Sequence, residues 1–374
     1  MIKRLRAYKT KLILNNKERT WCNQCAGASR WCYNWGLAAM IEAYGSERKT
    51  SVLTEKKRLN AIKDDIAPWL RDLPYVVLQE SFRNLDTAYK NFFRRVKQNA
   101  KAKGFPKFKS RKNARQSFRV RGSLHVTDTH IKVPRFGWLR LAEHGYLPKD
   151  GRRIKMLSAT ISTRNGGATW GVSLQVEEQV PEPAPATGPV LGIDLGIHAL
   201  AVVSDGTVYE NVKPLRTIER KIGMLSRELA RRKKGSANWG KTKTKLNKSH
   251  AKARHIRRNY LHAITSETVQ KNPSAVVMED LNVQGMMSNR HLSRAIADLG
   301  MYELRRQMTY KTEWNGSAVV LASRWYPSSK TCSQCGAIKS DLTLSDREYR
   351  CAECGAIIDR DLNAAINLST LTLA

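Results

Sequence analysis

The stretch VLGIDLGIHALAVVSDG, from Val190 to Gly206, most constrains what this chain can fold into. Apolar and β-branched residues surround its glycines, so it predicts a buried strand, a tight glycine turn and a second strand returning beside the first. Asp194 interrupts the apolar run. Because a buried ionised carboxylate costs several kcal/mol unless a cation or hydrogen-bond donors offset it, Asp194 needs a partner, for which Mg²⁺ is the usual choice.

The hairpin alone leaves three interpretations open. The same I-D-x-G pattern begins sugar kinases and other actin-like ATPases, where the acid and the glycines bind a nucleotide phosphate. It also begins polynucleotide nucleases of the RNase H type, and it could be a plain structural hairpin. The other acidic residues of the chain must decide between them.

The charge of the chain points to a polyanionic partner. The 374 residues allow two or three domains, and 66 Lys and Arg against 32 Asp and Glu give a formal net charge of +34. A membrane surface would also attract this charge, but no apolar run approaches the roughly 18 to 20 residues of a spanning helix. We therefore expect nucleic acid, and no membrane, as the partner.

The cysteines indicate a reducing compartment. There are seven, and the N-terminal MIKRLRAYKTKLIL lacks the apolar core of a signal peptide, so we expect a cytoplasmic protein. Cys22, Cys25 and Cys32 recur at helical spacing and are expected to be buried free thiols. The Cys22-x-x-Cys25 pair could instead be half of a metal site, although no second pair lies near it.

The N-terminal half reads as helices and strands with a basic segment between them. Residues 1–14 alternate basic and apolar positions like an edge strand, and Asn15-Asn16 is expected to form a turn. Helices follow, and in the segment 104–122 phenylalanines alternate with Lys and Arg, which suits nucleic-acid contact or, less well, a solvated loop. Short alternating runs over 123–179 predict a barrel or sandwich, and prolines predict a linker over 178–189.

Beyond the Asp194 hairpin, a long basic tract predicts two helices that contact a nucleic-acid backbone, with a break between Gly235 and Gly240. Two further acidic motifs follow. SAVVMEDLN places Glu279 at the end of an apolar strand, and DRDLNAAINL places Asp359 and Asp361 before an apolar helix. Taken singly, the first is most often a strand terminus and the second a helix cap.

The order of these acids is informative. Two-metal hydrolysis of a phosphodiester needs three or four carboxylates around two cations about 3.5 to 4 Å apart. Asp194, Glu279 and a C-terminal Asp can supply that set. Transposases of the same superfold place Glu last, so the order Asp, Glu, Asp favours a RuvC-like nuclease over a strand-transfer enzyme.

A zinc site is predicted between the second and third acids. Cys332-x-x-Cys335 and Cys351-x-x-Cys354 are separated by fifteen residues, and each pair offers two thiolates to one tetrahedral Zn²⁺. Four cysteines fill the coordination sphere, so the expected Zn²⁺ is structural and takes no part in catalysis.

With these motifs in place, the chain resembles the TnpB family of transposon-encoded RNA-guided DNA endonucleases, which are related to the type V CRISPR effectors. GIDLG, VVMEDLN, PSSKTCSQCG, CAECG and DRDLNAAINL carry the resemblance, which extends upstream to LQESFRNLDTAYKNFFRR and GFPKFKSR. It implies a multidomain α+β fold: an RNase H-like (RuvC) α/β nuclease domain with an inserted zinc ribbon, an N-terminal β-barrel wedge domain and a helical recognition domain. The implied ranges are 1–14 and 116–185 for the wedge, 15–115 for recognition, 186–326 and 356–374 for the nuclease and 327–355 for the ribbon.

The resemblance also implies roles for particular residues. Asp194, Glu279 and Asp361 match the acids that bind Mg²⁺ and cut DNA, and the family's D-x-N-A-A pattern favours Asp361 over Asp359. The partners would be a guide RNA from the transposon end and target DNA cut beside a short adjacent motif. The candidate readers of that motif are Gln79, Gln116, Ser117, Phe118 and Arg119.

Two alternatives of other classes remain. A guide-dependent DNA-binding repressor on the same scaffold would have lost RuvC acids, and all three are present. A transposase is disfavoured by the order of the carboxylates. The ATPase interpretation is weaker, because no second phosphate or adenosine motif follows and a zinc ribbon has no role there.

Overall fold

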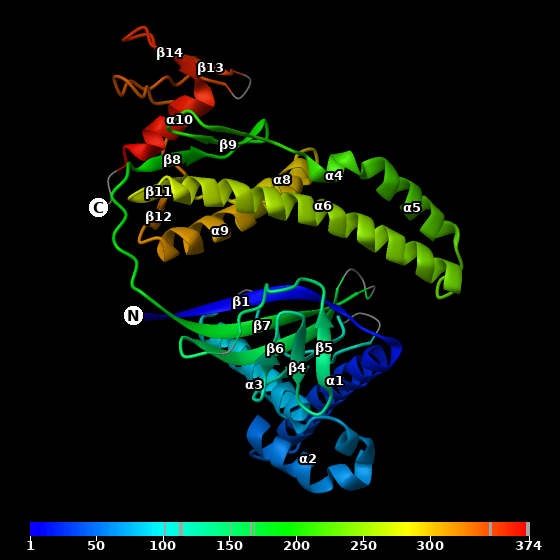
Figure 1. Cartoon of the computed structure of the whole chain (residues 1–374). Helices are drawn as coiled ribbons and strands as arrows, with labels where there is room; N and C mark the ends of the chain where they lie inside the picture. The colour runs from blue at the N-terminus through cyan, green and yellow to red at the C-terminus, as the bar shows by residue number, and fades with distance from the viewer. Residues whose placement is uncertain are drawn as a thin grey trace. The chain divides into compact units, whose positions relative to one another are not determined.

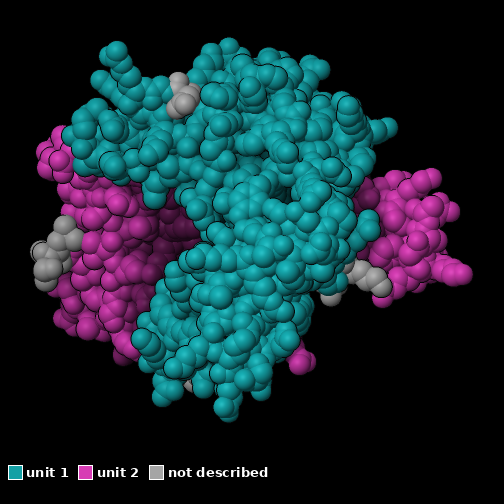
Figure 2. Space-filling view, turned by 90° about the horizontal axis from the view of Figure 1, so that it is seen from below, with its two compact units in different colours: residues 1–181 teal, residues 182–374 magenta. Residues whose placement is uncertain are grey.

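The computed structural model of the chain describes residues 1–100, 102–111, 115–149, 151–164, 167, 169–343 and 346–371. The chain divides into two compact units, unit 1 (Met1–Pro181) and unit 2 (Glu182–Ala374), which Figure 2 colours separately. Each unit has its own apolar core. Strand β7 (Thr169–Val180) ends one residue before the boundary, so the first residues of the predicted linker belong to a sheet. No described helix is long and apolar enough to cross a membrane.

Unit 1 contains a seven-stranded antiparallel sheet in the order β2-β6-β7-β1-β5-β4-β3. Its other strands are β1 (Ile2–Ile13), β2 (Ser117–Val120), β3 (His125–Val126), β4 (His130–Val133), β5 (Gly137–Leu141) and β6 (Ile154–Arg164). Among the described residues no pairing joins β2 to β3, so closure of this sheet into a barrel stays a prediction.

Strand β1 is not an edge strand, contrary to the sequence prediction. It pairs with β7 from Ile2–Val180 to Leu12–Trp170, and its last residues, Leu12 and Ile13, also pair with β5. Most of its side chains are nevertheless exposed. An antiparallel sheet with a solvated face accepts charged residues on an inner strand, so alternation alone could not distinguish centre from edge.

The helices of unit 1 pack around the long helix α1 (Asn16–Gly45). They are α2 (Val52–Ile66), the 3₁₀ helix η1 (Pro68–Asp72) and α3 (Tyr75–Lys97). Asn15 does not form the predicted turn: it caps α1, its side chain accepting from the Glu18 amide while the Glu18 carboxylate accepts from the Asn15 amide. Gly36 lets α3 approach, since a Cβ there would lie 2.7 Å from the Phe82 ring.

The prediction of buried free thiols on α1 is confirmed. Cys22, Cys25 and Cys32 are each fully buried in the core of unit 1. Burial raises the pKa of the Cys22 and Cys32 thiols to about 12. These neutral thiols act as small apolar side chains, so Cys22 and Cys25 are not half of a metal site.

Unit 2 contains a mixed five-stranded sheet in the order β10-β9-β8-β11-β12. Its strands are β8 (Leu191–Asp194), β9 (Ala199–Val203), β10 (Val208–Glu210), β11 (Ala275–Glu279) and β12 (Ala318–Ala322). Strands β8 and β9 form the predicted antiparallel hairpin, with Asp194 opposite Val202. Strands β11 and β12 run parallel to β8, which requires helical crossovers.

Helices cover both faces of this sheet (Figure 1). The crossovers contain α4 (Pro214–Thr217), α5 (Glu219–Arg231) and α6 (Ala237–Gln270), then α7 (Val283–Met286), α8 (Ser293–Leu299) and α9 (Met301–Trp314). Alternate strand residues such as Ile193 and Met278 pack against α6 and α9. The final helix, α10 (Arg360–Ser369), covers the opposite face. This burial on both faces explains the continuous apolar runs in the sequence.

The basic tract of unit 2 forms two helices that lie side by side, α5 and α6 (Figure 1). Thr242 of α6 donates to Glu228 of α5 at 3.0 Å. The break lies earlier than predicted: Ser236 caps α6, so Gly240 lies inside the helix. A serine N-cap outweighs the poor helix propensity of one glycine.

Candidate active site and metal centre

Two of the predicted acids lie at the same edge of the unit 2 sheet. Asp194 is the last residue of β8 and Glu279 the last residue of β11. The two strands are parallel, with Ile193 opposite Met278, so the next residue of each strand reaches the same edge. Carboxylates nearly ninety residues apart in the sequence are thereby brought to neighbouring positions.

The third acid comes from helix α10. Asp361 lies in its first turn, and the helix crosses β8 at very close range. A Cβ at Gly192 would lie 1.9 Å from the carbonyl oxygen of Ala365, so only glycine allows this approach. Gly192, the first glycine of the GIDLG motif, therefore lets α10, the helix that carries Asp361, pack against the strand that carries Asp194.

The charges of Glu279 and Asp361 act on Asp194. Burial, and then the charges of Glu279 and Asp361, raise the pKa of Asp194 from 3.8 to about 7, while Arg360 acts in the opposite direction. Carboxylates that repel one another at a site shielded from water favour the binding of a cation. Oxygen ligands of this kind suit Mg²⁺, so the residues present fit that ion.

The geometry is open rather than closed. Among the described residues, the oxygens of Asp194, Glu279 and Asp361 do not form a group within 4.8 Å, as the cysteine sulfurs do. The guanidinium of Arg360 donates to Asp361 at 3.0 Å and partly neutralises the charge of that carboxylate.

The neighbouring acids have other partners. Asp359 caps α10, its side chain accepting from the amides of Asp361 and Leu362 at 2.9 Å. Asp280 is ion-paired with Arg305 and Arg324, which lower its pKa. Asp359 therefore has a capping role, while the charge of Asp361 acts on Asp194.

Sequence reasoning missed several polar residues beside the acids. Ser328 donates to Glu279 Oε1 at 2.6 Å. The buried Asn363 and Asn367 of α10 both donate to the carbonyl of Thr331, the residue before Cys332. The signal was present in DRDLNAAINL, where the two asparagines lie four residues apart and hence on one face of a helix.

The four cysteines of the predicted zinc site converge. Their sulfur atoms all lie within 4.8 Å of one another, with 3.7 Å from Cys332 to Cys354 and 3.5 Å from Cys335 to Cys351. Tetrahedral Zn–S bonds of about 2.3 Å place sulfurs about 3.8 Å apart.

A small two-stranded sheet supports this cluster. Strands β13 (Glu348–Arg350) and β14 (Ile357–Asp359) are antiparallel, and Tyr349 is fully buried beneath the cysteines. Each cysteine pair is followed directly by a glycine of positive φ, Gly336 after the first pair and Gly355 after the second. This arrangement is compatible with a zinc ribbon.

The predicted motif-reading residues lie in unit 1 and differ in exposure. Gln79, Gln116, Ser117 and Arg119 are half-buried, and Gln116 accepts from Arg30 at 2.7 Å. Phe118, in contrast, is 2% exposed and packs edge-on against Trp21, so no ring face is left for a base. In strand β2 every second side chain faces the core, and Phe118 occupies such a position.

The aromatic–basic segment 104–122 is only partly described, because residues 112–114 lie outside the described ranges. Within it, Phe105 and Phe108 are about half exposed. Their rings are therefore accessible, unlike that of Phe118.

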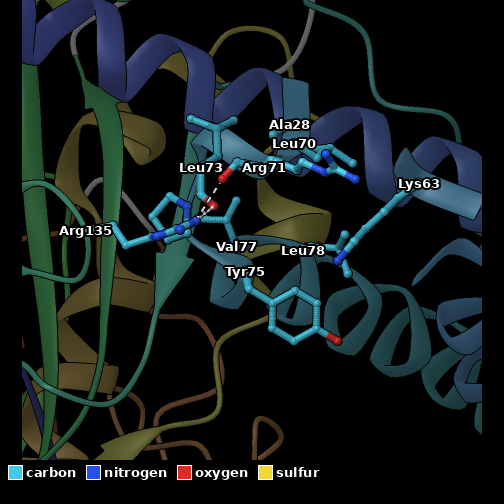
Figure 3. Close-up of a pocket in the computed structure, with 10 residues that line it drawn as sticks. Ala28, Lys63, Leu70, Arg71, Leu73, Tyr75, Val77, Leu78 and Arg135 are labelled. Atoms are coloured by element: carbon cyan, nitrogen blue, oxygen red, sulfur yellow. Dashed lines mark hydrogen bonds between the residues drawn. The ribbon is translucent and has the colours of Figure 1, made fainter. Parts of the chain in front are cut away.

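Unit 1 also contains a cavity of about 370 Å³ lined by apolar and basic side chains (Figure 3). The basic ones are Lys63, Arg71 and Arg135, and no Asp or Glu is among the described lining residues. Arg135 has a left-handed backbone, with φ of 63°, and donates to the carbonyls of Arg71 and Leu73 at 2.8 and 3.1 Å. These bonds fix the Arg135 guanidinium in the lining of the cavity.

Family models match three parts of the chain. The model described as "Probable transposase" matches residues 173–290, a "Cas12f1-like, TNB domain" model matches 302–368 and a "Helix-turn-helix domain" model matches 1–49. In the structure, residues 1–49 contain strand β1 and the single helix α1, so this region is not built as two helices joined by a turn.

Curated relatives match nearly the full length. "Putative RNA-guided DNA endonuclease InsQ" of Escherichia coli K12 is 33% identical over 98% of this chain and 92% of its own length. A second protein, "Putative RNA-guided DNA endonuclease" of Streptomyces pristinaespiralis, is 35% identical over 99% of this chain and 90% of its own. The chain belongs to the TnpB family.

Solved structures agree at the level of the fold. The protein of the "Cas12f1-sgRNA-target DNA complex" aligns with 96% of this TnpB-family chain and 84% of its own, at a TM-score of 0.56 and 14% identity. Identity this low shows a shared fold alone. The predicted combination of helices and sheets is thereby confirmed, while the RNase H-like assignment of unit 2 and the wedge barrel remain predictions.

Proposed function

We propose that this TnpB-family protein is an RNA-guided, Mg²⁺-dependent DNA endonuclease with one RuvC-like site. The observation that carries the proposal is the convergence of β8, β11 and α10, which carry Asp194, Glu279 and Asp361, with the pKa of Asp194 raised first by burial and then by the other two acids. The named relatives, which are RNA-guided DNA endonucleases by description, support the same class.

In this proposal the three carboxylates hold two Mg²⁺ ions. Bound there, the ions would activate water and stabilise the leaving oxygen of a phosphodiester. The chain supplies the oxygen ligands and their spacing. It also supplies a desolvated setting for Asp194 in which a deprotonated carboxylate is stable only beside positive charge.

The four cysteines are proposed to hold a structural Zn²⁺. Four thiolates leave no open coordination position, so this ion has no role in cleavage. Its function is to shape the segment between β12 and α10.

The partners in this proposal are a guide RNA from the transposon end and a target DNA. Pairing between them would read the sequence, while the protein grips phosphates with its excess of Lys and Arg. The proposed readers of the target-adjacent motif are Gln79, Gln116, Ser117 and Arg119. Phe118 is not among them, because its ring is buried. The domain ranges implied by the family and the cytoplasmic location are likewise proposals.

The deciding experiment begins with the RNA. The protein is purified from cells that carry its native locus, and the bound RNA is sequenced and used to program cleavage of a matching plasmid. We expect a discrete RNA with a variable end and Mg²⁺-dependent cutting. Asp194→Ala should retain the RNA and lose the cutting. Heterogeneous RNA and no programmed cleavage would refute the proposal, while RNA-dependent binding without cleavage by the unmodified protein would favour the repressor alternative.

A further inference from the structure

We infer that Ser328 is a positioning residue for Glu279, holding that carboxylate in the orientation in which it binds a divalent cation. The inference rests on the proposed function, because it assumes that Glu279 is a metal ligand. Ser328 does not itself reach the metal in this inference: it acts only through the carboxylate.

The contact is short and sheltered. The Ser328 hydroxyl donates to Glu279 Oε1 at 2.6 Å, and Ser328 is 3% exposed. Hydrogen bonds to an ionised oxygen are about twice as strong as neutral ones. No described residue donates to the second oxygen, Oε2, at hydrogen-bonding distance, so one oxygen is fixed and the other is left for a ligand.

Ser328 is itself held in place by the helix that carries Asp361. Asn367 of α10 donates to the backbone carbonyl of Ser328 at 2.8 Å and to that of Thr331 at 2.6 Å. One turn earlier, Asn363 donates to the carbonyl of Thr331 at 2.7 Å and accepts from the Ser333 amide at 2.9 Å. The serine is thus fixed relative to α10, and through it Glu279 is fixed relative to Asp361.

The chemistry of the donor matters as much as its position. A hydroxyl orients a carboxylate without neutralising it, whereas the guanidinium groups of Arg305 and Arg324 neutralise the adjacent Asp280. Of these two consecutive acids, Glu279 accepts from an uncharged donor, whereas Asp280 is paired with two cations. Donors that orient metal ligands typically change metal affinity by about 10- to 100-fold when removed.

The test measures metal binding separately from cleavage. Mn²⁺ binding to the full chain with its bound RNA is titrated by electron paramagnetic resonance, for the unmodified protein, Ser328→Ala and the adjacent control Ser329→Ala. We expect Ser328→Ala to weaken Mn²⁺ binding about tenfold and to raise the Mg²⁺ concentration for half-maximal cleavage similarly. Zinc content should stay constant, and Ser329→Ala should behave like the unmodified protein.

An isosteric pair separates the hydroxyl from the packing. Ser328→Thr keeps the donor and Ser328→Val replaces it with a methyl group of nearly the same shape, so the two variants add the same bulk and differ in the hydroxyl. We expect Thr to retain Mn²⁺ affinity and Val to lose it; equal affinities for Thr and Val would overturn the inference, even if Ser328→Ala unfolds. If the unmodified protein binds Mn²⁺ but cuts no programmed DNA, the proposed function fails while this comparison still decides the role of Ser328. Absence of Mn²⁺ binding to the unmodified protein would refute the inference.

Discussion

The two candidate metal sites of unit 2 are built in opposite ways. The cysteine cluster draws its four ligands from 23 residues, Cys332 to Cys354, and the sulfurs already lie within 4.8 Å of one another. The carboxylate site draws its ligands from β8, β11 and α10, across most of the unit, and its oxygens are farther apart. One site is complete and local, and the other is open and assembled from distant segments.

In the proposed function, this difference separates a structural site from a reactive one. A filled tetrahedral sphere leaves nothing for substrate, so the cysteines stabilise the fold. Carboxylates held near one another at an electrostatic cost remain available to ions and phosphates. The segment Pro327–Ser333 joins the two sites, because it contacts Glu279 through Ser328 and also contains Cys332.

The largest expected effect comes from the open site. Glu279→Gln should reduce cleavage of programmed DNA by at least about 10³-fold, equivalent to about 4 kcal/mol, because a metal ligand loses its charge. The matched control is Asp280→Asn, the next residue, whose carboxylate is bound by two arginines. It should cut within about threefold of the unmodified protein once its stability is taken into account. Equal losses in both variants would contradict the assignment of Glu279.

The closed site should respond in stability first. Cys351→Ser removes a zinc ligand, and structural zinc contributes on the order of 10 kcal/mol to the folding of small zinc peptides. We expect loss of stoichiometric zinc, measured by mass spectrometry, and a lower Tm. Cleavage should fall as well, because the segment that carries Ser328 loses its anchor. The control Cys32→Ala lies in the core of unit 1 and should keep one zinc per chain while also lowering the Tm.

The raised pKa of Asp194 predicts how pH affects the metal-free protein. With magnesium removed by dialysis and no chelator, so that zinc stays bound, Asp194 has a pKa of about 7 against an ordinary 3.8. Between these values the folded protein binds more protons than the unfolded one, so the free energy of unfolding should fall as the pH rises from about 4 to about 7. Urea unfolding at a series of pH values measures this. Asp194→Asn should lack that contribution, and curves of identical slope would argue against the raised pKa.

The smallest change in activity is expected for Asp359, the first of the two neighbouring acids at the start of α10. Asp359→Ala removes an N-cap and should cost about 1 kcal/mol of stability while cleavage changes by less than about threefold. Asp361→Asn, two residues on, should instead abolish cleavage. Urea unfolding and a cleavage assay on both variants test the distinction, and the reverse pattern would exchange their roles.

Some features were predictable because they depend on local sequence. The cysteine spacing, the β8–β9 hairpin and the buried thiols of α1 each follow from residues close together in the chain. Features that depend on distant neighbours were predicted less well. Strand β1 is internal because β5 pairs with its end, and Phe118 is buried because Trp21 of α1 covers it. Neither neighbour can be read from the segment itself.

The sequence by itself determined the types of ligand, their order and the identity of the family. Periodicity, knuckle spacing and motif order are properties of the chain in one dimension. Only the tertiary structure showed that the Asp359 side chain accepts from helix amides and so caps α10, which supports the choice of Asp361 that the D-x-N-A-A pattern favours. It alone revealed the bond from Ser328 to Glu279, which joins residues 49 positions apart. Contacts of this kind require packed elements to fix both partners, so they exist only in the folded chain.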